Sequence, residues 1–179
     1  MIKTNCNLLV IFGATGDLAR RKLFPALNDI MSSNKLPKNT HLICCGRKKI
    51  DNNIFNDLDT SLKNKSIYLK IDPNYYDDFM NLKNKIESYN KKFDIVNVIF
   101  YLSTPPQAYM DIISKLANAN LNNELSGFRR LVIEKPFTQL YKKREIVVEN
   151  VLQRHRKKIE ISSFDYHGRD VELFRSRPP

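Results

Sequence analysis

Short apolar runs alternate along this chain with longer segments in which apolar residues recur every three to four positions. The short runs are typical of buried strands and cover residues 8–12, 41–45, 67–71, 96–102 and 131–134. The segments with helical spacing cover residues 18–30, 51–63, 75–89 and 107–119. Strands and helices in alternation predict an α/β fold with a doubly wound, mostly parallel sheet.

A glycine turn stands between the first predicted strand and the first predicted helix. Gly13 allows the chain to turn where a Cβ would clash, and Gly16 allows the backbone to approach a ligand closely. Ala19 supplies a small residue where the helix packs on the strand. The N–H groups at a helix start suit a phosphate, so the segment predicts a Rossmann-like pyrophosphate site. Two glycines in such a turn also have a purely structural explanation, and Asp17 suits an N-cap, a ligand contact or both.

Basic residues follow the second predicted strand, where an NAD site would carry an acidic residue for the ribose 2′-hydroxyl. Here Gly46 is followed by Arg47, Lys48 and Lys49. A guanidinium binds a 2′-phosphate through charge-assisted, bidentate hydrogen bonds. The position therefore favours NADP over NAD, and a solvated run of charges is the alternative interpretation.

Two more segments follow strands, where open α/β sheets bind their ligands. Residues 101–109 (YLSTPPQAY) contain a Pro-Pro pair that fixes the loop after the fourth strand. Residues 131–137 (LVIEKPF) place Lys135 directly after the fifth strand, beside Glu134, and in position to meet an anion or a hydroxyl. For residues 101–109 the alternative is a rigid connection without a ligand role. For Lys135 it is an ordinary surface Lys-Pro pair.

Composition limits the classes of partner. The net charge is +11, but the Lys and Arg residues are dispersed and no nucleic-acid-reading motif accompanies them, so we expect no nucleic-acid partner. Cys6, Cys44 and Cys45 show no metal-ligand spacing, which predicts small buried side chains and no metal site. No apolar run is long enough to span a membrane and the N-terminus lacks a signal-peptide pattern, so we expect a cytoplasmic protein.

Four segments together resemble one enzyme family. VIFGATGDLARRKLFPAL, the Gly46-Arg47 pair, FYLSTPPQAY and VIEKPF look like the coenzyme domain of glucose-6-phosphate dehydrogenase in order and spacing. The resemblance implies an NADP-dependent oxidoreductase of the pentose phosphate pathway, which oxidises C1 of glucose 6-phosphate to 6-phosphogluconolactone. It implies that the pyrophosphate is bound by Gly13, Ala14, Thr15, Gly16, Asp17, Leu18, Ala19 and Arg20. It further implies that Arg47 binds the 2′-phosphate, that Tyr109 lines the cofactor cleft, and that Lys135 contacts both cofactor and sugar.

The chain departs from the family pattern after Phe137. Thr138 replaces a glycine, and residues 163–169 (SFDYHGR) stand where the family carries RIDHYLGK. By this alignment Asp165 matches the aspartate that orients the catalytic histidine, and His167 matches a phosphate-binding position. Lys135 and Asp165 are thus the catalytic candidates, and Lys135 and His167 the substrate-binding candidates.

The sequence therefore predicts residues 1–137 as a dinucleotide-binding domain and residues 138–179 as a divergent extension of that domain with a disordered tail. Family members are over twice as long, so we expect an N-terminal portion without the large domain. That domain carries the family's catalytic base and dimer interface, which predicts a monomer with little turnover alone. A stand-alone NADP-binding module without catalysis is the alternative.

Overall fold

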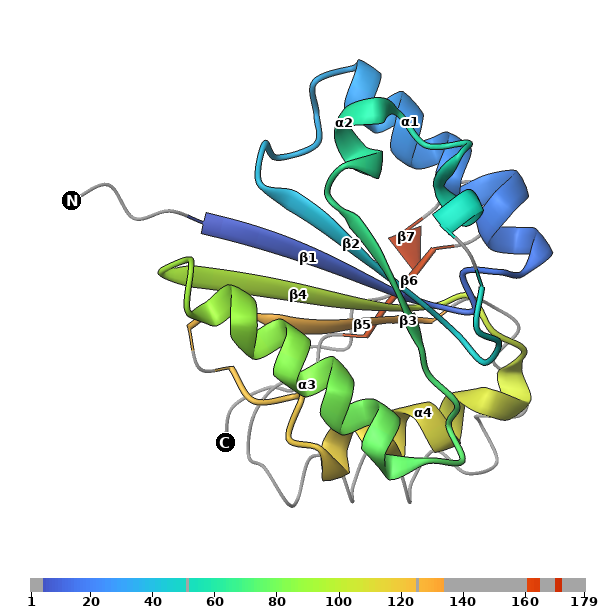
Figure 1. Cartoon of the computed structure of the whole chain (residues 1–179), viewed down its shortest axis with the longest axis vertical. Helices are drawn as coiled ribbons and strands as arrows, with labels where there is room; N and C mark the ends of the chain where they lie inside the picture. Colours follow the sequence, from blue (N-terminus) through green and yellow to red (C-terminus); the bar gives the residue numbers. More distant parts are fainter. Residues whose placement is uncertain (1–4, 51, 125, 134–160, 165–169, 172–179) are drawn as a thin grey trace.

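A single mixed sheet organises the described part of the chain. The computed structural model describes residues 5–50, 52–124, 126–133, 161–164 and 170–171 (Figure 1). Its strands are β1 (Asn5–Phe12), β2 (Thr40–Gly46), β3 (Ser66–Lys70), β4 (Ile95–Leu102), β5 (Arg129–Ile133), β6 (Ile161–Phe164) and β7 (Asp170–Val171). They are ordered β3-β2-β1-β4-β5-β6-β7, and all neighbours are parallel except β6 and β7. The predicted doubly wound, mostly parallel sheet is confirmed.

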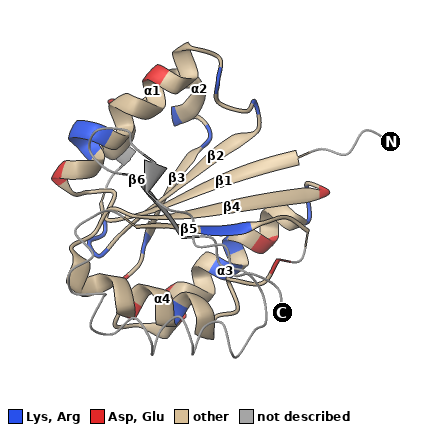
Figure 2. Cartoon of the chain, turned by 180° about the vertical axis from the view of Figure 1, so that it is seen from behind, with Lys and Arg blue, Asp and Glu red and all other residues tan. Residues whose placement is uncertain are grey.

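Helices cover both faces of this sheet. They are η1 (Ala19–Leu23), α1 (Phe24–Ser32), η2 (Asn52–Phe55), α2 (Thr60–Lys63), α3 (Tyr76–Asn90), η3 (Pro106–Ala108) and α4 (Tyr109–Asn118). In Figure 1, α1 and α2 lie on one side of the sheet and α3 and α4 on the other. Seen from behind, the Lys and Arg residues are spread over several helices, loops and β5 (Figure 2).

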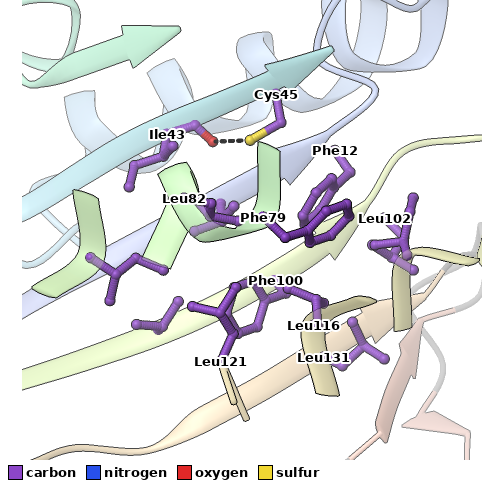
Figure 3. Close-up of a cluster of buried hydrophobic side chains, with 14 of the residues drawn as sticks. Phe12, Ile43, Cys45, Phe79, Leu82, Phe100, Leu102, Leu116, Leu121 and Leu131 are labelled. Carbon is purple, nitrogen blue, oxygen red and sulfur yellow. Dashed lines mark hydrogen bonds between the residues drawn. The ribbon is translucent and has the colours of Figure 1, made fainter. Parts of the chain in front are cut away.

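Two apolar clusters fill the space between the sheet and its helices. Phe79, Leu82 and Ile86 of α3 pack with alternate residues of β4 and with α4 (Figure 3). The rings of Phe12 and Phe79 stack with centroids 6.0 Å apart. On the opposite face, Phe24 and Leu27 of α1 pack in a second cluster with residues of β1, β2 and α2. β1 and β2 are thus buried on both faces, as central parallel strands require.

The predicted helix over residues 51–63 is wrong. The structure has the short 3₁₀ helix η2 and the four-residue α2 instead. Asp59 caps α2, because its carboxylate accepts a hydrogen bond from the Ser61 N–H at 2.8 Å. Asn28 of α1 fixes the break: its side chain donates to the Asp57 carbonyl at 2.7 Å and accepts from the Asp59 N–H at 2.8 Å. This contact replaces the hydrogen bonds that a continuous helix would supply.

The predicted helix over residues 18–30 exists but is not uniform. Its first part, η1, is a π-helical turn, and the α-helix begins at Phe24. The change coincides with Pro25, which has no N–H and whose ring would clash with the carbonyl of Arg21 in an α-helix.

The apolar run over residues 159–164 also predicts a strand, and the structure has it as β6. The charged segment over residues 142–158, which predicts a further helix, lies outside the described residues, as do Glu134 and the tail. The division of the chain at residue 137 stays a prediction.

Candidate dinucleotide-binding site

The candidate site lies where the strand order of the sheet reverses. β1 pairs with β2 on one side and with β4 on the other. The helices that follow β1 and β4 therefore lie on opposite faces of the sheet (Figure 1). Such a switch point is where open α/β sheets bind ligands. The Ser103 N–H donates to the Phe12 carbonyl at 2.9 Å, which holds the loop after β4 against the glycine turn.

Gly13 is required at this contact. Its φ is +79°, and a Cβ there would lie 2.4 Å from the Ser103 carbonyl oxygen and 2.9 Å from Cγ2 of Thr104. Gly16 has less severe surroundings, since its Cβ would lie 3.1 Å from the Gly13 carbonyl oxygen. The two glycines therefore differ in role. Gly13 permits the turn itself, whereas Gly16 is predicted to leave the backbone open to close approach by a ligand.

Backbone hydrogen bonds hold the turn on β2. The N–H groups of Gly13 and Ala14 both donate to the Cys45 carbonyl, at 2.9 and 3.1 Å, and the Gly16 N–H donates to the Gly13 carbonyl at 2.9 Å. Ala14 and Ala19 are fully buried beneath the turn. Because the first N–H groups of a helix have no intrahelical acceptor, the start of the following helix offers donors to an anion.

The remaining residues of the turn lie nearer the surface. Thr15, Asp17 and Arg20 are exposed and Leu18 is half-buried. Asp17 forms an ion pair with Nε of Arg21 at 2.7 Å, a role that the sequence did not suggest. Cofactor contacts by these side chains stay predictions.

An open pocket joins the glycine turn to the basic loop after β2. It has a volume of about 550 Å³ and is lined by Thr15, Arg47, Lys48 and Asp72. The structure thus brings together the turn and Arg47, which the sequence assigned to one ligand. Asp72, two residues after the end of β3, was missed. Its carboxylate accepts hydrogen bonds from the N–H and side-chain amide of Asn74 at 3.0 and 2.9 Å.

Two hydroxyl groups beside the glycine turn were also missed. Oγ of Ser103 and Oγ1 of Thr104 are buried and have no hydrogen-bond partner among the described residues. Ser103 is only 8% exposed. Buried polar groups are normally paired, so two orphaned hydroxyls at the switch point fit a site that receives a polar ligand. A dinucleotide, with its phosphate and ribose oxygens, matches both the turn and these hydroxyls.

Of the remaining predicted site residues only Tyr109 is described, and it is not among the residues that line this pocket. Tyr109 is the first residue of α4 and is 2% exposed, and its ring packs in the cluster with α3. Its predicted place in the cofactor cleft stays a prediction. Lys135, Asp165 and His167 lie outside the described residues. The described residues therefore include those predicted for the cofactor but not those predicted for the sugar.

The cysteines are buried, as predicted, and His41 also has a structural position. His41 lies at the amino end of β2, far along the strand from the pocket, with its ring 5.0 Å from that of Tyr89. Burial lowers the pKa of His41, with contributions from nearby lysines. Cys44 is buried, and burial raises the pKa of its thiol to about 12. Within the residues described, no group of three or more His, Cys, Asp and Glu side chains is arranged to hold a metal ion.

The fold and this site define a dinucleotide-binding α/β domain. Residues 10–167 match the family model described as "Glucose-6-phosphate dehydrogenase, NAD binding domain". The chain belongs to the glucose-6-phosphate dehydrogenase family, by its coenzyme domain. The family named from the motifs is thereby confirmed.

Similar proteins support the assignment. A glucose-6-phosphate 1-dehydrogenase of Treponema pallidum is 34% identical over 150 residues, which cover 73% of this chain and 29% of that protein. One of Schizosaccharomyces pombe is 33% identical over 153 residues, covering 76% and 30% respectively. The chain thus spans less than a third of the length of these curated relatives.

Solved structures agree with the sequence matches. A glucose-6-phosphate dehydrogenase in complex with its substrate glucose-6-phosphate superposes with a TM-score of 0.73 at 26% identity, over 92% of this chain and 37% of that one. The enzyme of Mycobacterium avium gives a TM-score of 0.66 at 25% identity, over 89% and 36%. Among the described residues, no helix has the length and apolar character needed to cross a membrane.

Proposed function

We propose that this chain binds NADP at the carboxyl ends of β1, β2 and β4 and supplies the coenzyme half of glucose 6-phosphate oxidation. The observation that carries the proposal is the pocket in which Thr15 of the glycine turn meets Arg47 and Lys48. A pyrophosphate at the turn leaves the adenosine ribose pointing toward the second strand in this class of fold. The two cations then favour the extra phosphate of NADP over the bare hydroxyl of NAD.

The protein's own part in the reaction is to bind and orient. The N–H groups of Gly13, Ala14 and Gly16 already donate within the fold, so the donors for the pyrophosphate are those at the start of the helix after the turn. The Ser103 hydroxyl offers a buried hydrogen-bonding group beside the turn. The bound cofactor would supply the hydride acceptor for the oxidation. We assign Lys135, Asp165 and His167 to the sugar side from their motif positions. A general base within hydrogen-bond reach of the sugar hydroxyl is also needed, and we assign none.

We propose glucose 6-phosphate as the substrate because a similar solved enzyme is in complex with it. We also propose that the chain is monomeric and cytoplasmic, and that it turns over little substrate alone. The last expectation follows because it spans less than a third of its curated relatives.

Calorimetric titration with NADP and NAD tests the cofactor assignment. Wild type is expected to bind NADP more tightly than NAD, and Arg47→Ala to weaken NADP binding by about 12- to 160-fold, since a hydrogen bond to a charged group contributes about 1.5–3 kcal/mol. NAD binding should change little. Lys49→Ala is the matched control, because Lys49 is exposed and is not among the pocket's lining residues. Equal losses for NADP and NAD in Arg47→Ala would refute the assigned role of Arg47.

A coupled assay separates an enzyme from a binding module. Purified chain is mixed with glucose 6-phosphate and NADP, and NADPH is followed by absorbance. Little or no NADPH together with NADP-selective binding agrees with a coenzyme domain or a stand-alone module. Robust NADPH formation would contradict the expectation of little turnover, and no binding at millimolar NADP would contradict the proposal as a whole.

A further inference from the structure

Tyr68 of β3 makes an unusual contact with the loop that carries the pocket's two cations. Its hydroxyl donates a hydrogen bond to the Lys48 carbonyl at 2.6 Å. Tyr68 pairs in register with Cys44, two residues before the end of β2, so the side chain reaches forward past the strand end to the loop. The ring is half-buried and packs against the apolar cluster beneath α1. The hydroxyl is therefore presented to the loop by a packed ring.

The chain leaves space for this contact at Gly46. A Cβ on Gly46 would lie 2.7 Å from the Tyr68 hydroxyl oxygen and 3.3 Å from Cγ2 of Thr15. The Gly46 carbonyl accepts a hydrogen bond from the Ile71 N–H at 2.9 Å. The start of the loop is thus fixed at Gly46 by the backbone directly after β3, and the loop is held again at Lys48 by the Tyr68 hydroxyl. Thr15, from the glycine turn, borders the same space.

We propose that Tyr68 is a positioning residue that holds the Arg47-Lys48 loop in the geometry that receives a 2′-phosphate, and so determines selectivity for NADP over NAD. The proposal rests on the proposed function, because it deepens the same site. Arg47 and Lys48 are exposed, and long exposed side chains lose conformational entropy when they are ordered on a ligand. A loop already fixed at the Lys48 carbonyl lowers that cost for both cations. Tyr68 touches no cofactor atom in this scheme and acts through the loop.

The hydroxyl keeps its donor proton at neutral pH. Burial raises the pKa of Tyr68, and the neighbouring thiols of Cys45 and Cys44 raise it further. The contact with the Lys48 carbonyl is therefore present across the pH range in which the cofactor is bound.

Tyr68→Phe removes the hydroxyl and keeps the packed ring. NADP affinity is expected to fall about 2- to 12-fold, since one neutral hydrogen bond contributes about 0.5–1.5 kcal/mol. NAD affinity should stay within about 2-fold of wild type. Tyr76→Phe is the matched control, because the Tyr76 hydroxyl also donates to a backbone carbonyl, that of Asn118, but on a different part of the surface. A loss shared equally by NADP and NAD would overturn the selectivity role.

A double-mutant cycle tests whether Tyr68 acts through the cationic loop. In an Arg47→Ala background, Tyr68→Phe is expected to have less effect on NADP affinity than it has in wild type. Full additivity of the two losses would overturn the proposed route through this loop.

Hydrogen exchange without cofactor separates this proposal from the proposed function. The Ile71 amide, which donates to the Gly46 carbonyl at the start of the loop, is expected to exchange faster in Tyr68→Phe than in wild type or Tyr76→Phe. Unchanged exchange would overturn the anchor even if NADP binds as proposed. A wild-type chain without preference for NADP would overturn the selectivity role together with the proposed function, while faster exchange in Tyr68→Phe would still show that the loop is anchored.

Discussion

Gly13→Ala is the substitution with the most sharply defined consequence in this structure. The φ of +79° at Gly13 lies in the left-handed region, which an alanine adopts only with strain. The new Cβ would lie 2.4 Å from the Ser103 carbonyl oxygen and 2.9 Å from its carbonyl carbon. Both are backbone atoms at the end of β4, so no flexible side chain can move aside.

The cost has two parts. A left-handed backbone costs a residue with a Cβ about 1–2 kcal/mol. Forcing extra volume into a packed site typically costs about 1–3 kcal/mol more. The sum, about 2–5 kcal/mol, is a large fraction of the 5–15 kcal/mol by which folded domains are generally stable.

Urea denaturation followed by far-UV circular dichroism measures this loss. With a typical urea dependence of about 2 kcal/mol per molar, the midpoint should fall by roughly 1–2.5 M. Gly16→Ala is the matched control, since its φ lies outside the left-handed region and its Cβ would approach the Gly13 carbonyl oxygen only to 3.1 Å. We expect it to cost less than about 1 kcal/mol. A Gly13→Ala midpoint equal to that of wild type, or a Gly16→Ala loss of the same size, would refute the reasoning.

Three further predictions concern groups outside the pocket. Burial raises the pKa of the Cys6 thiol to about 11 and that of the Cys44 thiol to about 12. An aromatic disulfide reagent at about pH 8 should therefore label neither thiol until urea unfolds the chain. Rapid labelling of the folded chain would contradict their burial. Burial lowers the pKa of His41, so the unfolded chain takes up this proton first as the pH falls through about 6.5, and the free energy of unfolding should decrease there. Urea titrations at about pH 7.5 and 5.5 should show a smaller decrease in His41→Gln than in wild type, and an equal decrease in the two proteins would contradict this. The buried Arg129 guanidinium donates a hydrogen bond to the Val96 carbonyl at 2.6 Å. Arg129→Met should therefore lower the free energy of unfolding by about 1.5–3 kcal/mol and Tm by about 3–12 °C. An unchanged Tm by calorimetry would show that the contact is not stabilising.

The strands could be predicted because burial on both faces leaves a visible pattern in the sequence. β4 is expected over 96–102 and is observed over Ile95–Leu102. β1 begins three residues earlier than predicted, because its polar start is stabilised by neighbouring strands: Asn7 accepts a hydrogen bond from the Asn97 side chain at 3.1 Å. The break within 51–63 was missed for a similar reason, since Asn28 of a different helix fixes it. A contact between distant segments has no signature in local spacing.

In the candidate site, too, features carried by adjacent residues could be predicted, whereas those that depend on contacts between distant segments could not. The glycine turn and Arg47 could be predicted because each carries its chemistry in adjacent residues. Ser103 could not, because its significance lies in a buried hydroxyl without a described partner. Tyr68 is twenty positions from Lys48 in the sequence, and only the pairing of β2 with β3 brings them together. Register and burial, rather than residue type, identify these two.

The pairing of β1 with β4 has a consequence for the order of events during folding. The partners in this ladder are about 90 positions apart in the sequence, from Asn5 with Ile95 to Phe12 with Leu102. Ladders between such distant segments form slowly, because a long loop must close before any of their hydrogen bonds can form. The contact of Gly13 with Ser103 lies at the end of this ladder. The glycine turn therefore contacts the segment after β4 only once this ladder has formed. Dinucleotide binding during refolding should thus follow the pairing of β4 with β1 rather than the earlier formation of local helices.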